Sequence, residues 1–418
     1  MPFASHGTAT AVHRLFTGFF LIGILGALGQ LLTGDLEAPA RVVAALWEAA
    51  DLAVEVSLGL IGVLALWSGL FRLAEESRLA DRLAGAVRPL LARLMPSLRR
   101  DPGAGAAVSM NLAANMLGLD NAATPLGLKA MEALQAHNPE PRRATDSQIM
   151  FLVLNTSSVT LVPVTVLLYR AQQGAADPAA VYLPMLMATT VSTFVGVALT
   201  ARVQRIPLRD PLLLTVAAAW LALLGLLALG IWLAPPALGS TLSGLIGNDI
   251  LLAVIGAFFW AAWRARVDSY DCFVEGAKEG FHLAVKLIPY LVAMLAAIAM
   301  LRASGALELF LDGIRHGAAA LGWDTRFVDA LPVAILKPLS GSGARAAMLD
   351  VMQSQGVDSL AGKMAAVMQG STETTFYVLA VYFGSVGIRD MRYALWCGLG
   401  ADVAGLVAAI GLSYLFFG

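Results

Sequence analysis

The sequence has little charge and almost no cysteine. Charged residues make up 14% of its 418 positions and hydrophobic residues 58%, whereas charged residues make up about a quarter of an average soluble domain. The formal net charge is -1, which argues against a nucleic-acid partner because binding to phosphates needs a basic excess. A mean hydropathy of +0.73 instead indicates a polytopic membrane protein whose main surroundings are the lipid bilayer.

The scarcity of reactive side chains also limits the chemistry. Cys272 and Cys397 are the only cysteines and lie far apart, so neither a disulfide framework nor a paired-cysteine metal site is indicated. The five histidines show no metal-ligand spacing. The sequence has no nucleophile-base-acid set, and the glycines near residue 341 are not followed by the Lys-Ser/Thr of a phosphate loop. We therefore expect no enzyme, no cofactor and no bound metal.

What the sequence does contain is nine apolar runs, each long enough to cross a bilayer at about 20 residues per span. The first run lacks a clear cleavage site, so we interpret it as a retained helix and not as a signal peptide. Residues 72–100 have leucines at helical spacing among seven arginines, which is typical of an interfacial amphipathic helix. The nine runs are 16–32, 46–71, 149–168, 183–201, 212–233, 245–263, 283–301, 364–383 and 394–417.

Two pairs of shorter apolar segments are each interrupted by a polar motif. The first motif is Asn121 to Gly127 (NAATPLG) and the second is Leu339 to Ala344 (LSGSGA). Segments of about 10 to 14 residues are too short to cross alone, and irregular backbone at membrane depth is tolerated only where it faces protein or a cavity. The pattern therefore predicts re-entrant half-helices. The flanking segments are 104–117, 125–134, 327–336 and 344–352.

The chain also repeats itself weakly and in the same order. A long helix introduced by Glu48 or Glu275 is followed by a broken motif and then by a polar cluster, which starts at Asn155 or Gln369. With the N-terminus in the cytoplasm, eighteen basic residues fall on the cytoplasmic side and six on the other, in agreement with the positive-inside rule. In this topology the two units have opposite orientations, as in many secondary transporters.

These observations predict an all-α polytopic membrane protein of the bacterial inner membrane, with two inverted-topology repeats and re-entrant broken helices. The predicted divisions are an N-terminal transmembrane helix (1–45), two repeat units (46–206 and 271–418) and linking transmembrane helices (207–270).

Polar residues at the helix breaks are the candidates for a substrate site. Their amides and hydroxyls suit a neutral or zwitterionic, hydrogen-bonding solute better than a bare cation. The predicted binding residues are Asn115, Asp120, Asn121, Thr124, Asn155, Thr156, Ser157, Ser158, Ser340, Ser342, Gln369, Ser371, Thr372 and Glu373.

Acidic residues at membrane depth are candidates for coupling to H⁺ or Na⁺. Glu373 and Asp120 lie within the polar clusters, and Asp402 in the last span is a weaker third candidate. Structural interpretations stay open beside these. Asp120 can cap a helix, Glu373 can pair with Lys337 or Arg345, and the hydroxyls can hold helices together.

The motifs resemble two known families. Residues 111–135 (NLAANMLGLDNAATPLGLKAMEALQ) resemble spore maturation protein A, and residues 338–344 and 368–388 (MQGSTETTFYVLAVYFGSVGI) resemble spore maturation protein B. The resemblance runs from about Leu46 to Gly411, like a natural fusion of the two. It implies two Gate units of the nucleoside-recognition superfamily, whose relatives include concentrative nucleoside transporters and the membrane domain of ferrous-iron transporter B.

We therefore predict secondary transport of a small polar organic solute, nucleoside-like or dipeptide-like, coupled to Na⁺ or H⁺. One alternative is a non-transporting membrane assembly or regulatory protein of the spore maturation family, and another is a divalent metal permease. A homodimer stays open as well, because small residues at four-residue spacing occur throughout the chain.

Overall fold

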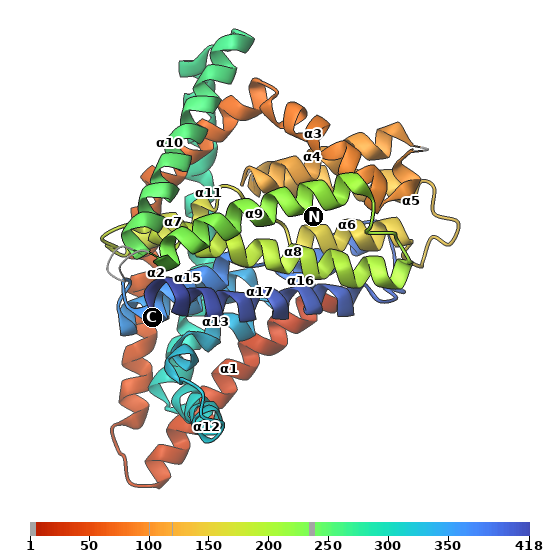
Figure 1. The fold of residues 1–418 in the computed structure, drawn as a ribbon. Coiled ribbons are helices and arrows are strands. Elements are labelled where there is room, and N and C mark those ends of the chain that lie inside the picture. Colours follow the sequence, from red (N-terminus) through yellow and green to blue (C-terminus); the bar gives the residue numbers. More distant parts are fainter. Residues whose placement is uncertain (1–5, 100, 119, 234–238) are drawn as a thin grey trace.

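The computed structural model describes residues 6–99, 101–118, 120–233 and 239–418 (Figure 1). Side chains of residues 1–15, 100, 119–122, 231–232 and 234–240 lie outside the described part, and these include the predicted site residues Asp120 and Asn121. The first half contains α1 (His6–Leu32), α2 (Ala38–Glu76), α3 (Leu79–Leu94), η1 (Pro96–Arg99), α4 (Pro102–Met116), α5 (Asp120–Gln135), α6 (Asp146–Thr156), α7 (Val164–Gln172), η2 (Pro178–Val181) and α8 (Tyr182–Gln204).

The second half follows two linking helices. These are α9 (Pro211–Leu233) and α10 (Gly239–Ala265). After them come α11 (Ser269–Ala303), α12 (Ala306–Ala320), η4 (Arg326–Ala330), α13 (Leu331–Leu336), α14 (Gly341–Gln355), α15 (Leu360–Gly370), α16 (Thr375–Ser385) and α17 (Ala394–Phe417).

Six helices in the described ranges are long and apolar enough to cross a bilayer, and Phe16–Leu32 is a shorter apolar helix. Large side chains such as Leu25, Trp47, Leu226 and Leu252 are exposed on the outside of the molecule, which is favourable where the surrounding solvent is lipid. The prediction of an all-α polytopic membrane protein is confirmed. The six are Ala38–Glu76, Pro178–Gln204, Pro211–Gly230, Thr241–Ala265, Ser269–Ala303 and Ala394–Phe417.

Two of the nine predicted spans are not continuous helices. In the run 149–168, α6 ends at Thr156 and α7 begins only at Val164; in the run 364–383, α15 ends at Gly370 and α16 begins at Thr375. Proline at 163 disfavours helix in the residue before it, and the hydroxyl residues at both breaks compete for backbone hydrogen bonds. The expectation of uninterrupted spans at these two places was wrong.

The first broken motif also differs from the expected boundary. The helix after the break begins at Asp120 and contains Pro125, whereas the sequence placed its start at Pro125. Pro125 is the sixth residue of this helix, so its missing N–H removes one intrahelical hydrogen bond there.

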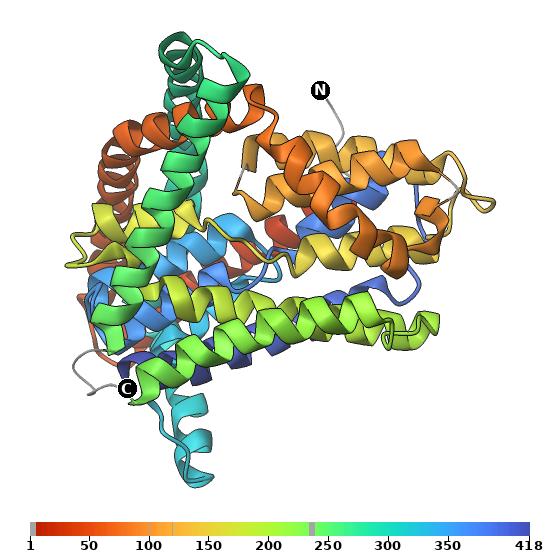
Figure 2. The same ribbon diagram turned by 45° about the horizontal axis from the view of Figure 1, so that its top comes forward.

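Long helices of the two halves pack against each other in opposite directions. A Cβ atom added at Gly276 would lie 2.5 Å from the carbonyl oxygen of Ser68, and one at Gly280 would lie 2.4 Å from that of Leu64, so α2 and α11 are antiparallel. A Cβ atom added at Gly405 of α17 would lie 3.0 Å from Cβ of Ser192 of α8, and these two helices run side by side (Figures 1 and 2). Inverted repeats would produce this pairing; the repeats and the re-entrant hairpins themselves stay predictions.

Backbone groups exposed by the helix breaks bond to one another. Leu161 N–H donates to the carbonyl of Met116 (2.8 Å), and Phe376 N–H donates to that of Pro338 (3.1 Å), so the two breaks within each half are joined. Glu373 N–H donates to the carbonyl of Thr156 (2.7 Å) and joins the halves. These hydrogen bonds satisfy backbone groups that have no water to bond to in an apolar environment.

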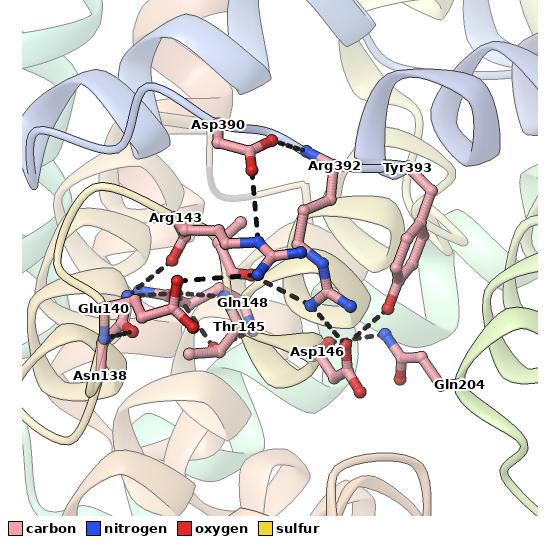
Figure 3. A network of polar contacts seen from close by, with 11 residues as sticks. Asn138, Glu140, Arg143, Thr145, Asp146, Gln148, Gln204, Asp390, Arg392 and Tyr393 are labelled. Atoms are coloured by element: carbon pink, nitrogen blue, oxygen red, sulfur yellow. Dashed lines mark hydrogen bonds and ion pairs between the residues drawn. The ribbon is translucent and has the colours of Figure 1, made fainter.

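Two loop contacts tie the halves together at separate places. In the first (Figure 3), Arg143 pairs with Asp390 (3.2 Å) and Arg392 pairs with Asp146 (2.7 Å). In the second, the buried guanidinium of Arg170 pairs with Asp358 (2.9 Å). The first contact joins the loop between α16 and α17 to the start of α6 and the loop before it, and the second joins the last turn of α7 to the loop before α15. We call them the 143–390 latch and the 170–358 latch.

Candidate functional site

A cavity of about 170 Å³ lies where the helix breaks of the two halves meet. Its walls come from the end of α4 and the α6–α7 break in the first half, and from α13, the start of α14 and the α15–α16 break in the second. The described lining residues are Asn115, Gly118, Ser158, Thr160, Val162, Pro163, Val164, Thr165, Val166, Tyr169, Lys337, Gly341, Arg345, Gln369, Gly370, Thr372, Glu373 and Thr374.

Gly118 allows the α4 end to approach the neighbouring break. Its φ is +71°, and a Cβ atom added there would lie 2.5 Å from the carbonyl oxygen of Val162. Glycine adopts this left-handed conformation without strain, and its lack of a side chain leaves room for that backbone. The close approach brings Asn115 and Ser158 to the same cavity wall.

The first-half wall is held by a small amide network. Asn115 donates through Nδ2 to Oδ1 of Asn155 (2.8 Å), and Asn155 donates in turn to the carbonyl of Phe151 (2.9 Å). Tyr382 of the second half also donates to Asn155 (3.4 Å). Asn155 therefore orients Asn115 from behind and does not itself line the cavity.

The second-half wall combines unpartnered oxygens with one exposed carboxylate. The buried side-chain oxygens of Gln369 and Thr372 have no hydrogen-bond partner, as is also true of Ser158 opposite. Glu373 is exposed, although its neighbours Thr372 and Thr374 are buried. A ligand in the cavity thus meets hydrogen-bonding groups that the protein leaves available.

Both signs of charge line the cavity. Lys337 and Arg345 line it together with Glu373, and the start of α14 at Gly341 adds the positive end of a helix dipole. Ser340 caps this helix by accepting from Gly343 N–H (3.1 Å). We had interpreted Lys337 and Arg345 only as counter-charges for Glu373. In the sequence, their positions on either side of LSGSGA are the feature that indicates that they belong to the site.

The predicted site residues fall into three groups. Asn115, Ser158, Gln369, Thr372 and Glu373 line the cavity. Others lie in or beside the breaks without being among the described lining residues, namely Thr124, Asn155, Thr156, Ser157, Ser340, Ser342 and Ser371. Asp120 and Asn121 fall outside the described side chains.

Several of the second group have structural hydrogen bonds. Ser157 donates to the carbonyl of Val153 (2.8 Å) and Ser371 to that of Met368 (2.8 Å), as Ser and Thr commonly do in membrane helices. Ser342 lies 3.3 Å from the hydroxyl of Ser340. Asp402 is fully buried in α17 and outside the described cavity lining. Within the described ranges no three His, Cys, Asp or Glu side chains gather as metal ligands would.

The fold and the cavity define a helical membrane protein with a polar site at its helix breaks, and comparison with known proteins gives its class. The chain belongs to the Gate family, described as nucleoside recognition, which matches it twice, at residues 57–172 and 284–389. The two matches each contain one broken motif and the polar cluster that follows it.

Two relatives come from Bacillus subtilis (strain 168). Spore maturation protein B is 47% identical over 153 residues, which cover 37% of this chain and 84% of that protein. Spore maturation protein A is 37% identical over 169 residues, which cover 40% of this chain and 85% of that protein. The chain is thus similar to a fusion of the two, as the motifs predicted.

Proposed function

We propose that this chain is a secondary transporter that binds a small polar organic solute in the cavity between the helix breaks and carries it across the bacterial inner membrane. One observation carries the proposal. Polar and charged side chains from both halves line a single cavity, although the helices around it are otherwise apolar. Membership of the Gate family supports it further. A cytoplasmic N-terminus remains part of the proposal.

The charges of the lining favour a zwitterionic solute such as a dipeptide or an amino acid. Lys337, Arg345 and the start of α14 suit a carboxylate, and Glu373 suits an ammonium group. The amide of Asn115 and the oxygen of Gln369 then bind peptide or other polar groups. A nucleoside is the second candidate, favoured by the family's description.

Movement of the halves against each other would expose the cavity to either side in turn. In transporters with inverted repeats, this motion is largely rocking of one repeat against the other around a fixed site. The 143–390 latch and the 170–358 latch join the halves at separate places. The ion pairs of one latch can therefore break while those of the other stay formed.

A thermal-shift screen of the purified full chain tests binding directly. We expect dipeptides or amino acids to raise the melting temperature, because a ligand that binds only the folded state stabilises it. Glu373→Gln and Lys337→Met should each weaken the response at least tenfold in half-saturating concentration. Thr124→Ala, outside the described lining, should leave it unchanged. Stabilisation by nucleosides alone would select the second candidate, and stabilisation by divalent metals alone would select the metal permease.

Uptake into proteoliposomes tests transport itself. A solute that stabilises the protein should accumulate inside vesicles when an ion gradient is applied, and Glu373→Gln should lower the rate. A flat response to every solute class in the screen, together with no uptake, would overturn the proposal in favour of a non-transporting assembly or regulatory protein.

A further inference from the structure

Asp402 lies in α17 with no exposed surface. Among the described residues neither of its carboxylate oxygens has a hydrogen-bond partner of good geometry, and Thr375 and Thr372 are the hydroxyl residues that interact with it. Burial of an ionised carboxylate without full compensation is strongly unfavourable. Such an acid in the centre of an otherwise apolar helix therefore needs a specific explanation.

Hydroxyl residues pack against the helix face that carries Asp402. Gly398 and Gly405 lie one turn before and one turn after it on the same helix face. Because neither has a side chain, Thr375 and Thr372 approach closely: their Cγ2 atoms lie 2.9 Å and 2.7 Å from where a Cβ atom would be at Gly398 and Gly405.

Two further hydroxyl residues reach this face from the first half. A Cβ atom added at Gly398 would lie 3.7 Å from Cγ2 of Thr156. One added at Gly405 would lie 3.0 Å from Cβ of Ser192. The carbonyl oxygen of Ser371, from the second half, would lie 3.2 Å from the same Cβ at Gly405. The hydroxyls of Thr156, Ser192, Thr372 and Thr375 are all buried without a hydrogen-bond partner. Four hydroxyl residues from both halves therefore pack against the helix face that carries Asp402.

We propose that Asp402 and these hydroxyls form a binding site for a monovalent cation, with Na⁺ as the ion that fits best. Oxygen ligands suit hard cations, and one ion can accept electron pairs from all of these oxygens. A proton on Asp402 is the competing explanation, because hydroxyl groups can both donate and accept hydrogen bonds, and the test below separates it from Na⁺. Ca²⁺ takes six to eight oxygen ligands and usually several carboxylates, whereas this cluster has one.

Charged groups of the solute cavity lie near this cluster. Lys337 attracts the carboxylate of Asp402 and Glu373 repels it, and Arg345 lines the same cavity as these two. Thr372 also lines the solute cavity, so it connects the two sites; coupling through it rests on the proposed transport function, but cation binding does not.

The test measures the melting temperature of the full chain in lipid nanodiscs, without any solute, as Na⁺ replaces choline at constant ionic strength. We expect the melting temperature to rise with the logarithm of the Na⁺ concentration, as linkage requires. Asp402→Asn should abolish this rise, and Thr375→Val should increase the half-saturating Na⁺ concentration at least tenfold. Ser413→Ala, which removes another buried unpartnered hydroxyl from α17, should keep the wild-type response.

Equal melting temperatures in Na⁺ and choline would overturn the proposal, as would an unchanged Na⁺ response in Asp402→Asn. A response to pH at fixed Na⁺, with none to Na⁺ itself, would assign the site to a proton and also overturn it. If Asp402→Asn does not fold, Thr375→Val decides the question alone. Because no solute is present, failure of the solute screen does not affect this result.

Discussion

Asn155 shows how one buried amide sets the geometry of the cavity. It accepts from Asn115 and from Tyr382, and it donates to the carbonyl of Phe151, so it connects α4, α6 and α16. Loss of such a group leaves its buried partners unsatisfied, which costs about 1 to 3 kcal/mol.

Asn155→Ala should therefore lower the free energy of unfolding by about 1 to 3 kcal/mol and weaken solute binding, because Asn115 loses its acceptor. Chemical denaturation and the thermal-shift assay measure the two effects. Ser109→Ala is the control, since Ser109 bonds only to the carbonyl of Gly105 within its own helix. Equal losses in both variants would refute a positioning role for Asn155.

Asp324 gives a prediction at low pH. The Arg326 side chain, together with its N–H and the hydroxyl of Tyr414, lowers the pKa of Asp324 from 3.8 to about 2. A carboxyl whose pKa is lower in the folded state than in the unfolded chain stabilises the folded state fully at any pH above its unfolded-state pKa. This stabilisation is lost as the pH falls from about 4 to 2.

We thus expect Asp324→Asn to flatten the fall in melting temperature over that pH range, by a modest amount because the group is exposed to solvent. Asp81→Asn, at an exposed position of α3, should follow the wild-type curve. An Asp324→Asn curve as steep as that of the wild type would show that the pair with Arg326 does not stabilise the fold.

At the scale of elements, the α2–α11 pair depends on backbone contact. Gly280 lies against the carbonyl of Leu64 with no room for a methyl group, whereas Gly62 on α2 has nothing within 4 Å of an added Cβ. Both glycines are helical, so the two positions differ in packing and not in backbone conformation.

Gly280→Ala should destabilise the protein by about 1 to 3 kcal/mol, because the helices must separate to admit the methyl group. Gly62→Ala should stabilise it by about 0.5 to 1 kcal/mol through the lower chain entropy of alanine. Denaturation of the two variants in the same detergent measures both signs. A neutral Gly280→Ala would mean that α2 and α11 are less closely packed than the structure shows.

The 143–390 latch provides a second test among elements. Arg392 bonds to Asp146 and to the carbonyl of Ala144, and it joins the start of α17 to the start of α6 (Figure 3). Arg389, three residues away, is exposed and forms no ion pair with any residue that the structure describes.

Arg392→Ala should therefore lower the free energy of unfolding by about 1 kcal/mol more than Arg389→Ala, a small effect because exposed ion pairs contribute little individually. Accessibility of a cysteine placed at Ser147 should also rise in Arg392→Ala, because the loop is no longer held. No difference between the two arginine variants would show that the latch does not hold the halves together.

For the whole molecule, the two halves bury their matching helices against each other. Relatives of the two halves exist as separate proteins, each with most of its length matched. Since α2 packs on α11 and α8 on α17, neither half covers its apolar helix faces alone.

Fragments 1–207 and 208–418, expressed together, should copurify as a one-to-one complex with the thermal response of the intact chain. Gly280→Leu in the second fragment should reduce the yield of complex severalfold, because leucine cannot fit against Leu64, whereas Gly62→Leu in the first fragment should not. Separate folding and purification of each fragment would contradict the packing argument.

Some of this arrangement was predictable from local chemistry. Glycine and proline act on the chain within a few residues, so the breaks near Gly118 and Pro338 could be found in the sequence, whereas the cap at Ser340 was seen only in the structure. The breaks after Thr156 and Gly370 were missed, because apolar residues dominate these runs and the contacts that support each break come from distant elements. The domain boundaries stay predictions.

The sequence by itself determined that this is an all-helical, multi-pass membrane protein with polar interruptions, because hydropathy and helix-breaking residues act locally. Only the tertiary structure decided which polar groups meet. It placed Lys337 and Arg345 beside Asn115 and surrounded Asp402 with hydroxyls from both halves. Those positions are separated by about two hundred residues, and packing between helices, which no local pattern specifies, brings them together.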